Sequence, residues 1–255
     1  MQNEVILKVQ DLSRRFGGVR AVDGISFEVK SGEALGIIGP NGSGKSTLIN
    51  LITGFVKPDK GAVFYKGNNI TGLKPHKIAS IGIARSFQTV KPFYNLPVYK
   101  NLIIPLYSNR VKKQLKGGCM GDRDEAAMHL LEEVGFERES NLPYKITGTL
   151  PHGYLKKLEL ARCLCLDPEI VIVDELFSGM SMSEIASAMP IMEKIVAEGK
   201  TLIMIEHRLR ELFRVVQGVM VLNFGKIIAR GTPEEVVKVE EVKEAYLGKE
   251  GETVA

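Results

Sequence analysis

Two kinds of apolar pattern alternate along the chain. Short runs rich in Val, Ile and Leu occur at residues 34–38, 169–175 and 201–207, without polar alternation. Such runs are typical of central parallel strands that are covered on both faces. Between them, apolar residues recur every three or four positions and predict helices within 46–53, 124–136, 155–168, 183–199 and 233–248. Strands that alternate with helices predict a parallel α/β core.

The remaining patterns predict hairpins and breaks. Residues 5–12 and 24–29 are β-rich and predict short strands, and residues 219–231 predict a hairpin. Pro190 lies in the middle of a helical pattern, and because it has no N–H it predicts a kink or an early end. The last residues, 249–255, are expected to fray.

The order of these elements predicts one domain over 1–255. The stretch 90–165 is mostly helical and interrupts the strands, so it is interpreted as an inserted helical subdomain. Residues 1–89 and 166–255 then form the catalytic core together with a β subdomain.

Composition and charge narrow the class of protein. With 255 residues, 44% of them hydrophobic and 25% charged, the chain has the makeup of a soluble globular protein. No apolar run reaches the roughly 18–20 residues that span a bilayer, and the N-terminus does not resemble a signal peptide, so a cytoplasmic location is expected. The net charge of +4 is concentrated between residues 108 and 123, where a solvated loop is the default expectation. The helical positions Cys163 and Cys165 are expected to be buried.

A glycine-rich segment follows the first buried run. The sequence GPNGSGKST fits GxxxxGK[ST], in which glycines let the backbone wrap a phosphate chain and the next helix adds its positive N-terminus. Lysine reaches the outer phosphates and the hydroxyl that follows it holds Mg²⁺. The residues of this predicted phosphate site are Gly39, Pro40, Asn41, Gly42, Ser43, Gly44, Lys45, Ser46 and Thr47.

Two acids end the second buried run. Asp174 and Glu175 lie where open α/β sheets bind ligands, at the carboxyl end of a strand. Asp174 is expected to serve Mg²⁺, and Glu175 to polarise an attacking water. Gln88 can touch Mg²⁺ or water, His207 can donate to a γ-phosphate, and Phe16 can stack on a base.

Taken in order, these residues and the segments LPHGY and SGMS resemble the ATP-binding subunit of ABC transporters over essentially the whole chain. The resemblance implies a P-loop NTPase (RecA-like) core with an antiparallel β subdomain and a helical subdomain. It assigns adenine stacking to Phe16, Mg²⁺ sensing to Gln88, and catalysis to Glu175, His207 and Lys45. The implied metal ligands are Ser46, Gln88 and Asp174. The implied signature residues are Leu150, Pro151, His152, Gly153 and Tyr154, and Ser178–Ser181 is the implied inter-subunit loop.

The resemblance also implies partners and a location. Two ATP-binding subunits, identical or different, pair head-to-tail with ATP and Mg²⁺ between them, and permease subunits hold them on the inner face of the membrane. The segment after Gln88, with Pro92, Phe93 and Tyr94, then receives a helix of the permease. GIARSFQTVKPF, MIEHRL and the ending ARGTPEEVV are most similar to branched-chain amino-acid (Liv-type) importers. No nucleic-acid partner is expected.

The segment 150–154 departs from the family's LSGGQ. Pro151 offers neither a hydroxyl nor an N–H, His152 and Tyr154 are also unusual, and Leu176 and Ser181 replace the usual Pro and Asp. The Gly153 N–H and the helix dipole remain for a phosphate, and His152 or Tyr154 could supply a donor. The alternatives are therefore a lipopolysaccharide-type exporter, a regulatory subunit with weak hydrolysis, and an ABC ATPase that works without a membrane partner.

Overall fold

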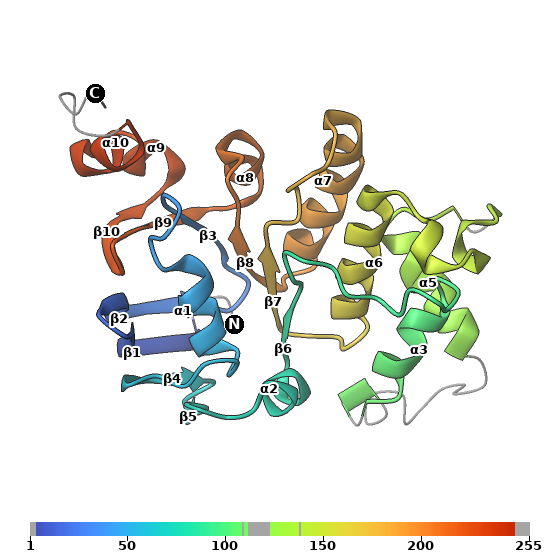
Figure 1. The fold of residues 1–255 in the computed structure, drawn as a ribbon, viewed down its shortest axis with the longest axis horizontal. Helices are drawn as coiled ribbons and strands as arrows, with labels where there is room; N and C mark the ends of the chain where they lie inside the picture. Colours follow the sequence, from blue (N-terminus) through green and yellow to red (C-terminus); the bar gives the residue numbers. More distant parts are fainter. Residues whose placement is uncertain (1–3, 109, 112–122, 138, 248–255) are drawn as a thin grey trace. The chain divides into compact units, whose positions relative to one another are not determined.

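The computed structural model describes residues 4–108, 110–111, 123–137 and 139–247 (Figure 1). These residues form two compact units, one made of the segments up to 75 and from 201, and one made of 76–200. The limits of the core and the helical subdomain given above stay a prediction. The expected fraying of 249–255 concerns residues outside the described part of the chain.

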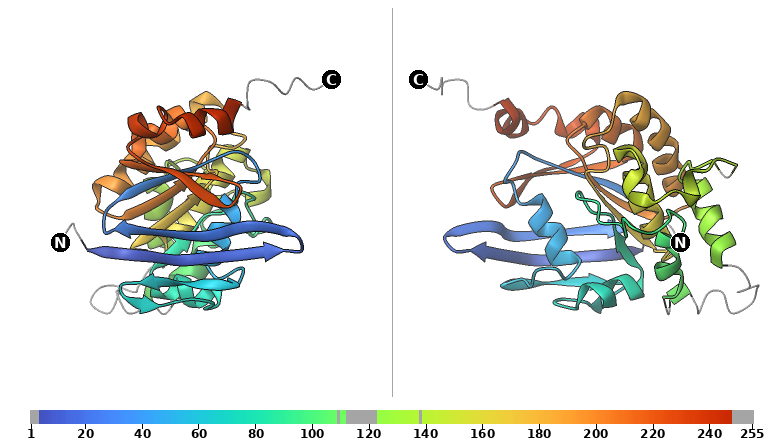
Figure 2. Two further views of the ribbon diagram at one scale, coloured as in Figure 1. Left: turned by 90° about the vertical axis from the view of Figure 1, so that its left-hand side faces the viewer. Right: turned by 45° about the vertical axis from the view of Figure 1, so that its right-hand side comes forward.

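An antiparallel sheet occupies the N-terminal part of the first unit. Its strand order is β2-β1-β4-β5. The strands are β1 (Val5–Phe16), β2 (Val19–Lys30), β4 (Lys60–Tyr65) and β5 (Asn68–Asn69). β1 and β2 form one long hairpin, which Figure 2 shows as two adjacent ribbons. The short strands predicted here are therefore wrong. A bulge near Asp11, which has φ 45°, lets β1 continue past the point where the alternation in the sequence ends.

The second group of strands in this unit is largely parallel. β3 (Ala34–Ile38) pairs in parallel with β8 (Thr201–Ile205) and with β9 (Gly218–Asn223), and β10 (Lys226–Gly231) pairs antiparallel with β9. Every residue of β3 and β8 is buried, which confirms two of the predicted central strands. The predicted hairpin at 219–231 is also confirmed.

Four helices complete the first unit. They are α1 (Lys45–Ile52), α8 (Leu209–Val215), α9 (Pro233–Val236) and α10 (Glu240–Leu247). The single terminal helix predicted over 233–248 is thus two helices. The break lies in a stretch rich in valine, whose β-branched side chain lowers helix propensity.

The second unit combines two parallel strands with helices. β6 (Ile83–Arg85) pairs with β7 (Ile170–Asp174), whose five residues are all buried. The helices are α2 (Pro75–Ile81), α3 (Lys100–Leu106), α5 (Arg123–Glu133), α6 (His152–Leu164) and α7 (Met182–Ala197), with 3₁₀ turns at Leu142–Tyr144 and Thr147–Thr149. None of the described helices is long and apolar enough to cross a membrane.

Two helices of this unit differ from the sequence patterns. α7 continues for seven residues beyond Pro190, so the predicted early end is wrong. Pro190 is exposed while Met189, Ile191 and Met192 are buried, so packing retains a helix that lacks one backbone hydrogen bond. α6 is buried on most of its circumference and not on a single face. The predicted burial of Cys163, in α6, and of Cys165, directly after it, is confirmed.

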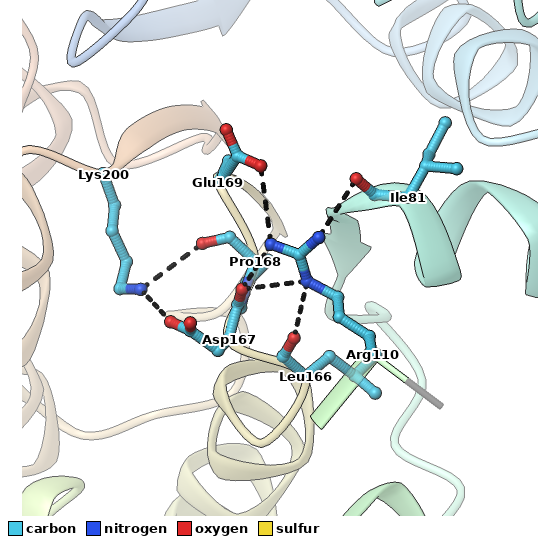
Figure 3. Close-up of polar contacts among 7 residues, drawn as sticks. All are labelled: Ile81, Arg110, Leu166, Asp167, Pro168, Glu169 and Lys200. Carbon is cyan, nitrogen blue, oxygen red and sulfur yellow. Dashed lines mark hydrogen bonds and ion pairs between the residues drawn. The ribbon is translucent and has the colours of Figure 1, made fainter. Parts of the chain in front are cut away.

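Arg110 joins three chain segments of the second unit (Figure 3). Its guanidinium donates to the carbonyls of Leu166 and Asp167, just beyond α6, and to the carbonyl of Ile81 at the end of α2, over 2.9–3.2 Å. Lys200 bonds the Asp167 carboxylate at 2.7 Å. A solvated position is therefore wrong for Arg110, because it satisfies carbonyls left over at helix ends. The other basic residues of this run before Arg123, and Asp122, lie outside the described residues.

Candidate functional site

The glycine-rich segment forms a loop between β3 and α1, as the sequence predicts. Gly39 has φ 150°, Gly42 has φ 79° and Gly44, which precedes the first turn of α1, has φ 104°. A Cβ on Gly39 would collide with the Leu222 carbonyl, and a Cβ on Gly44 with the Ala21 carbonyl. The close path of this loop therefore depends on glycine at both positions.

Lys45 is buried at the start of α1, and its ammonium lies inside the loop. Nζ donates to the carbonyl oxygens of Gly39 at 2.8 Å and Pro40 at 3.0 Å, and lies 3.5 Å from the Ser43 hydroxyl. Ser46 is exposed on the next position of the helix. The loop thus combines a charge, a hydroxyl and a helix N-terminus, which is the donor set that a phosphate chain requires.

The C-terminal helix α10 lies against this loop. A cavity of about 450 Å³ is lined by loop residues 40–43, by Asn223 and Phe224, and by Glu241, Glu244 and Ala245 of α10. Burial raises the pKa of Tyr246, whose hydroxyl accepts a hydrogen bond from the Gly39 N–H. Sequence patterns gave no indication of this contact, since more than 200 residues separate the two partners.

The acidic strand end belongs to the second unit. Asp174 ends β7 and is buried, and its Oδ2 accepts a hydrogen bond from Arg85 Nη2 at 2.6 Å. The other oxygen, Oδ1, is buried and has no hydrogen-bond partner among the described residues. An orphaned carboxylate oxygen is costly, and a water or a hard cation would satisfy it.

Mg²⁺ therefore fits this acid. The described residues contain no group of three or more His, Cys, Asp or Glu side chains that could hold a metal. Mg²⁺ is usually bound by one or two carboxylates together with phosphates and water, so a single carboxylate at Asp174 and the hydroxyl of Ser46 suit it better than an all-protein cage.

Glu175 follows Asp174 directly and adopts a left-handed backbone, with φ 51°. Its carboxylate Oε2 accepts a hydrogen bond from Gln88 Nε2 at 2.6 Å. The sequence predicted that Gln88 would touch Mg²⁺ or water, and the structure places its amide on the Glu175 carboxylate. Left-handed backbone at a bulky residue costs free energy and is found mainly at functional sites.

The segment 150–154 leads into α6. Leu150 is buried, Pro151 has φ −56° and ψ 153° and precedes the first helical residue, and α6 begins at His152. Pro151 therefore lies before the first turn, where its missing N–H costs little. The Tyr154 ring packs on Phe136 with centroids 5.1 Å apart, whereas His152 is exposed and lies close to Gly179.

Gly153 is already engaged within this chain. The Ser181 N–H and hydroxyl, and more weakly the Gly153 N–H, lower the pKa of the Glu184 carboxyl; burial acts in the opposite direction. Ser181, predicted to lie in the inter-subunit loop, forms a capping box with Glu184 at the start of α7. The N–H that the sequence predicted for a phosphate thus contacts a carboxylate in the structure.

Phe16 and His207 are accessible in the first unit. Phe16 ends β1 with 46% of its surface exposed, and the Arg14 guanidinium lies 4.9 Å from its ring centroid. His207 follows β8 and is exposed. Both positions agree with the places expected from the sequence, while their roles stay predictions.

A parallel sheet whose strand β3 runs through a left-handed glycine loop into a helix carrying Lys45 and Ser46 defines a P-loop nucleotide-binding protein. Comparison with protein families agrees, because the model described as "ABC transporter" matches residues 22–178. The chain therefore belongs to the ABC transporter family, and it is an ATPase subunit of this class. A second model, "Branched-chain amino acid ATP-binding cassette transporter", matches residues 226–252.

Curated relatives match nearly the whole chain. The branched-chain amino acid transport ATP-binding protein BraF of Pseudomonas aeruginosa is 34% identical over 252 residues, covering 95% of this chain and 98% of the relative. LivG of Methanocaldococcus jannaschii, described as a probable branched-chain amino acid transport ATP-binding protein, is 35% identical over 255 residues, covering 95% and 97%.

Solved structures give the same result. A nucleotide-free ATP-binding cassette from an ABC transporter superposes with a TM-score of 0.83 at 33% identity, covering 96% of this chain and all of that one. A cassette of an ABC transporter in its ADP conformation gives 0.82 at 32% identity, covering 97% and 100%. The predicted fold class and family are thereby confirmed.

Three functional neighbours were missed by sequence reasoning. Arg85, Lys156 and Glu184 contact residues of the predicted site from up to 89 positions away in the chain. The only available signal was a charged residue inside an apolar pattern, as at Arg85 in GIARSF and Lys156 in YLKKLEL.

Proposed function

We propose that this ATPase drives the import of branched-chain amino acids or related small solutes through a membrane permease. The likeness to branched-chain importer subunits supports this, because it runs over almost the whole chain and includes the C-terminal segment from residue 226. An exporter of the lipopolysaccharide type is the competing assignment.

The site residues divide into phosphate, metal and base roles. Lys45 and the loop N–H groups bind the phosphates, and Phe16 stacks on adenine. Ser46 and Asp174 hold Mg²⁺, which neutralises phosphate charge when it is bound. The Glu175 carboxylate accepts a proton from the attacking water. The hydrogen bond to Gln88 supports this role, since it orients the carboxylate.

Gln88 and His207 complete the proposed set. Gln88 can exchange its bond to Glu175 for one to Mg²⁺ or its water, and so report nucleotide to the rest of the second unit. His207 donates to the γ-phosphate, a role that its exposed position after β8 permits.

The permease docks on the second unit, after Gln88. Phe93, Tyr94 and Leu96 are exposed there, and backbone hydrogen bonds from Gly148 to Tyr94 and from Thr147 to Leu96 bring exposed Ile146 beside them. Contiguous exposed apolar side chains are typical of protein interaction surfaces. A second ATP-binding subunit pairs head-to-tail through the segment 150–154, and the assembly lies on the inner face of the membrane.

Purification of the chain with its membrane partners tests this proposal. We expect a permease to co-purify in detergent, and vesicles carrying the complex to accumulate labelled leucine when ATP is supplied. Glu175→Gln should abolish ATP turnover while ATP binding remains. Recovery of a lipid-exporting permease would overturn the import assignment, and unchanged turnover in Glu175→Gln would overturn the catalytic assignment.

One observation favours a second candidate, a regulatory subunit with weak hydrolysis in the complex. The Gly153 N–H contacts Glu184, and Pro151 lacks both donor groups, so the segment 150–154 offers a phosphate fewer donors than LSGGQ. Replacing 150–154 by LSGGQ should raise ATP turnover of the complex several-fold if this candidate holds, and should leave it unchanged if it does not.

A further inference from the structure

Lys156 is a buried cation at the back of the catalytic acid. It lies in the second turn of α6, and only 2% of its surface is exposed. Its Nζ donates to the backbone carbonyl of Gln88 at 2.6 Å and to that of Glu175 at 3.0 Å. A buried ammonium is costly unless hydrogen bonds compensate it, so this arrangement requires a strong local reason.

Together, the three residues form a closed ring of hydrogen bonds. The Gln88 side chain binds the Glu175 carboxylate at 2.6 Å, while Lys156 binds the backbones of both residues. Fixing the two backbones fixes the separation over which the side chains can meet. The orientation of the carboxylate therefore depends on Lys156 as well as on Gln88.

Glu175 has a particular need for such support. Its left-handed backbone, with φ 51°, is unfavourable for a residue with a side chain, and such conformations persist only when their surroundings enforce them. The ammonium of Lys156 binds the carbonyl of this same residue. Without it, the strand end could relax and carry the carboxylate away from its working direction.

The helix that carries Lys156 also begins at the segment 150–154. Lys156 is two residues beyond Tyr154, so a movement of the first turn of α6 reaches its ammonium through one turn of helix. The segment proposed to bind the partner subunit's ATP is thus connected to the acid proposed to hydrolyse this subunit's own ATP.

We propose that Lys156 is a positioning residue for hydrolysis, which holds Glu175 in its catalytic orientation and links it to the segment 150–154. This inference rests on the proposed function, in which Glu175 is the general base. Lys156 touches no reacting atom and acts only through Glu175 and Gln88.

The adjacent Lys157 provides a matched control. It is also buried in α6, and burial lowers its pKa, but its ammonium lies 5.6 Å from the Tyr154 ring centroid and near Gly135. It has the same side chain and almost the same helix position. Loss of a buried lysine as such should therefore affect both variants alike, and loss of the Glu175 contact should affect Lys156 alone.

The test compares ATP turnover and ATP binding of the full-length chain in its purified complex. Lys156→Met should lower kcat about 10–100-fold, as expected for a misplaced catalytic group, with KM and the Kd for ATP within about threefold of wild type. Lys156→Arg, which keeps the donors, should recover part of kcat. Lys157→Met should stay within about threefold of wild type in both constants.

A double variant separates positioning from general structural damage. Because Glu175→Gln already removes the base, adding Lys156→Met should not lower the residual turnover further. An additive loss would overturn the proposal, as would equal kcat losses in Lys156→Met and Lys157→Met. Should Lys156→Met fail to fold, Lys156→Arg and Lys156→Gln carry the same comparison.

These measurements also separate the two levels of the argument. If Glu175→Gln keeps its turnover, the proposed general base is wrong. If Glu175→Gln is inactive while Lys156→Met has normal kcat, the general base stands and the inference about Lys156 fails.

Discussion

The ion pair between Arg85 and Asp174 permits a quantitative prediction. The two residues end the parallel strands β6 and β7, and Nη2 and Oδ2 are 2.6 Å apart. Their side chains are only 8% and 4% exposed. Arg85→Met keeps an unbranched apolar side chain and removes the charge, leaving the Asp174 carboxylate buried without that countercharge.

The expected loss of stability follows from this burial. Removing one partner of a buried pair costs about 3–5 kcal/mol, chiefly because the remaining charge is uncompensated. A Coulomb estimate agrees, since unit charges about 4 Å apart at an effective dielectric of about 20 attract by about 4 kcal/mol. For a chain of this size, such a loss lowers the melting temperature by roughly 6–20 °C.

An exposed pair in the same protein supplies the control. Lys8 and Glu28 are 2.7 Å apart, but their side chains are 41% and 46% exposed. Solvent screens such pairs, so Lys8→Met should cost about 0.2–1 kcal/mol. Equal interatomic distances thus predict very different losses, and burial is the variable that separates them.

Urea unfolding and thermal melting of the purified chain measure the global loss, and hydrogen exchange at the amides of β7 locates it. Arg85→Met/Asp174→Asn should be more stable than Arg85→Met alone, because the buried charge is gone. The reasoning is refuted if Arg85→Met costs no more than Lys8→Met, or if adding Asp174→Asn restores nothing.

Three further predictions use other parts of the chain. Phe16→Ala should weaken ATP binding by about 5–150-fold in equilibrium dialysis with an unchanged melting temperature, because base–aromatic stacking contributes about 1–3 kcal/mol; unchanged affinity would exclude the stacking role. Pro190→Ala should restore a backbone hydrogen bond in α7 and stabilise the chain by about 1–3 kcal/mol in urea unfolding, and a lower midpoint would contradict this. Burial raises the pKa of Cys165 to about 12 and that of Cys163 well above its usual value, so both thiols stay protonated at pH 8. In a Cys119→Ser chain, a thiol reagent should therefore label them at pH 8 only after denaturation, and rapid labelling of the native chain would disprove their burial.

Local patterns in the sequence were sufficient for the phosphate loop and the central strands. The glycines of 39–44 and the unbroken apolar runs of β3, β7 and β8 report local backbone needs and burial on two faces. These features depend on neighbours in the chain, so a sequence pattern contains them.

Features that depend on distant partners were not predictable. A lysine is usually exposed, and no pattern in α6 indicates that Lys156 meets the carbonyl of Gln88, 68 residues away. α7 extends past Pro190 because buried methionines and isoleucines on either side of it outweigh one lost hydrogen bond. Both outcomes are decided by tertiary packing.

The contact between Gly153 and Glu184 limits how the segment 150–154 can vary. A Cβ at residue 153 would collide with the Glu184 carboxylate, which Ser181 holds in the cap of α7. Any larger residue must therefore displace that carboxylate and lose a cap that contributes about 0.5–2 kcal/mol. In a saturation mutagenesis of these five positions, exposed Pro151 and His152 should accept many residues, whereas position 153 should accept glycine alone.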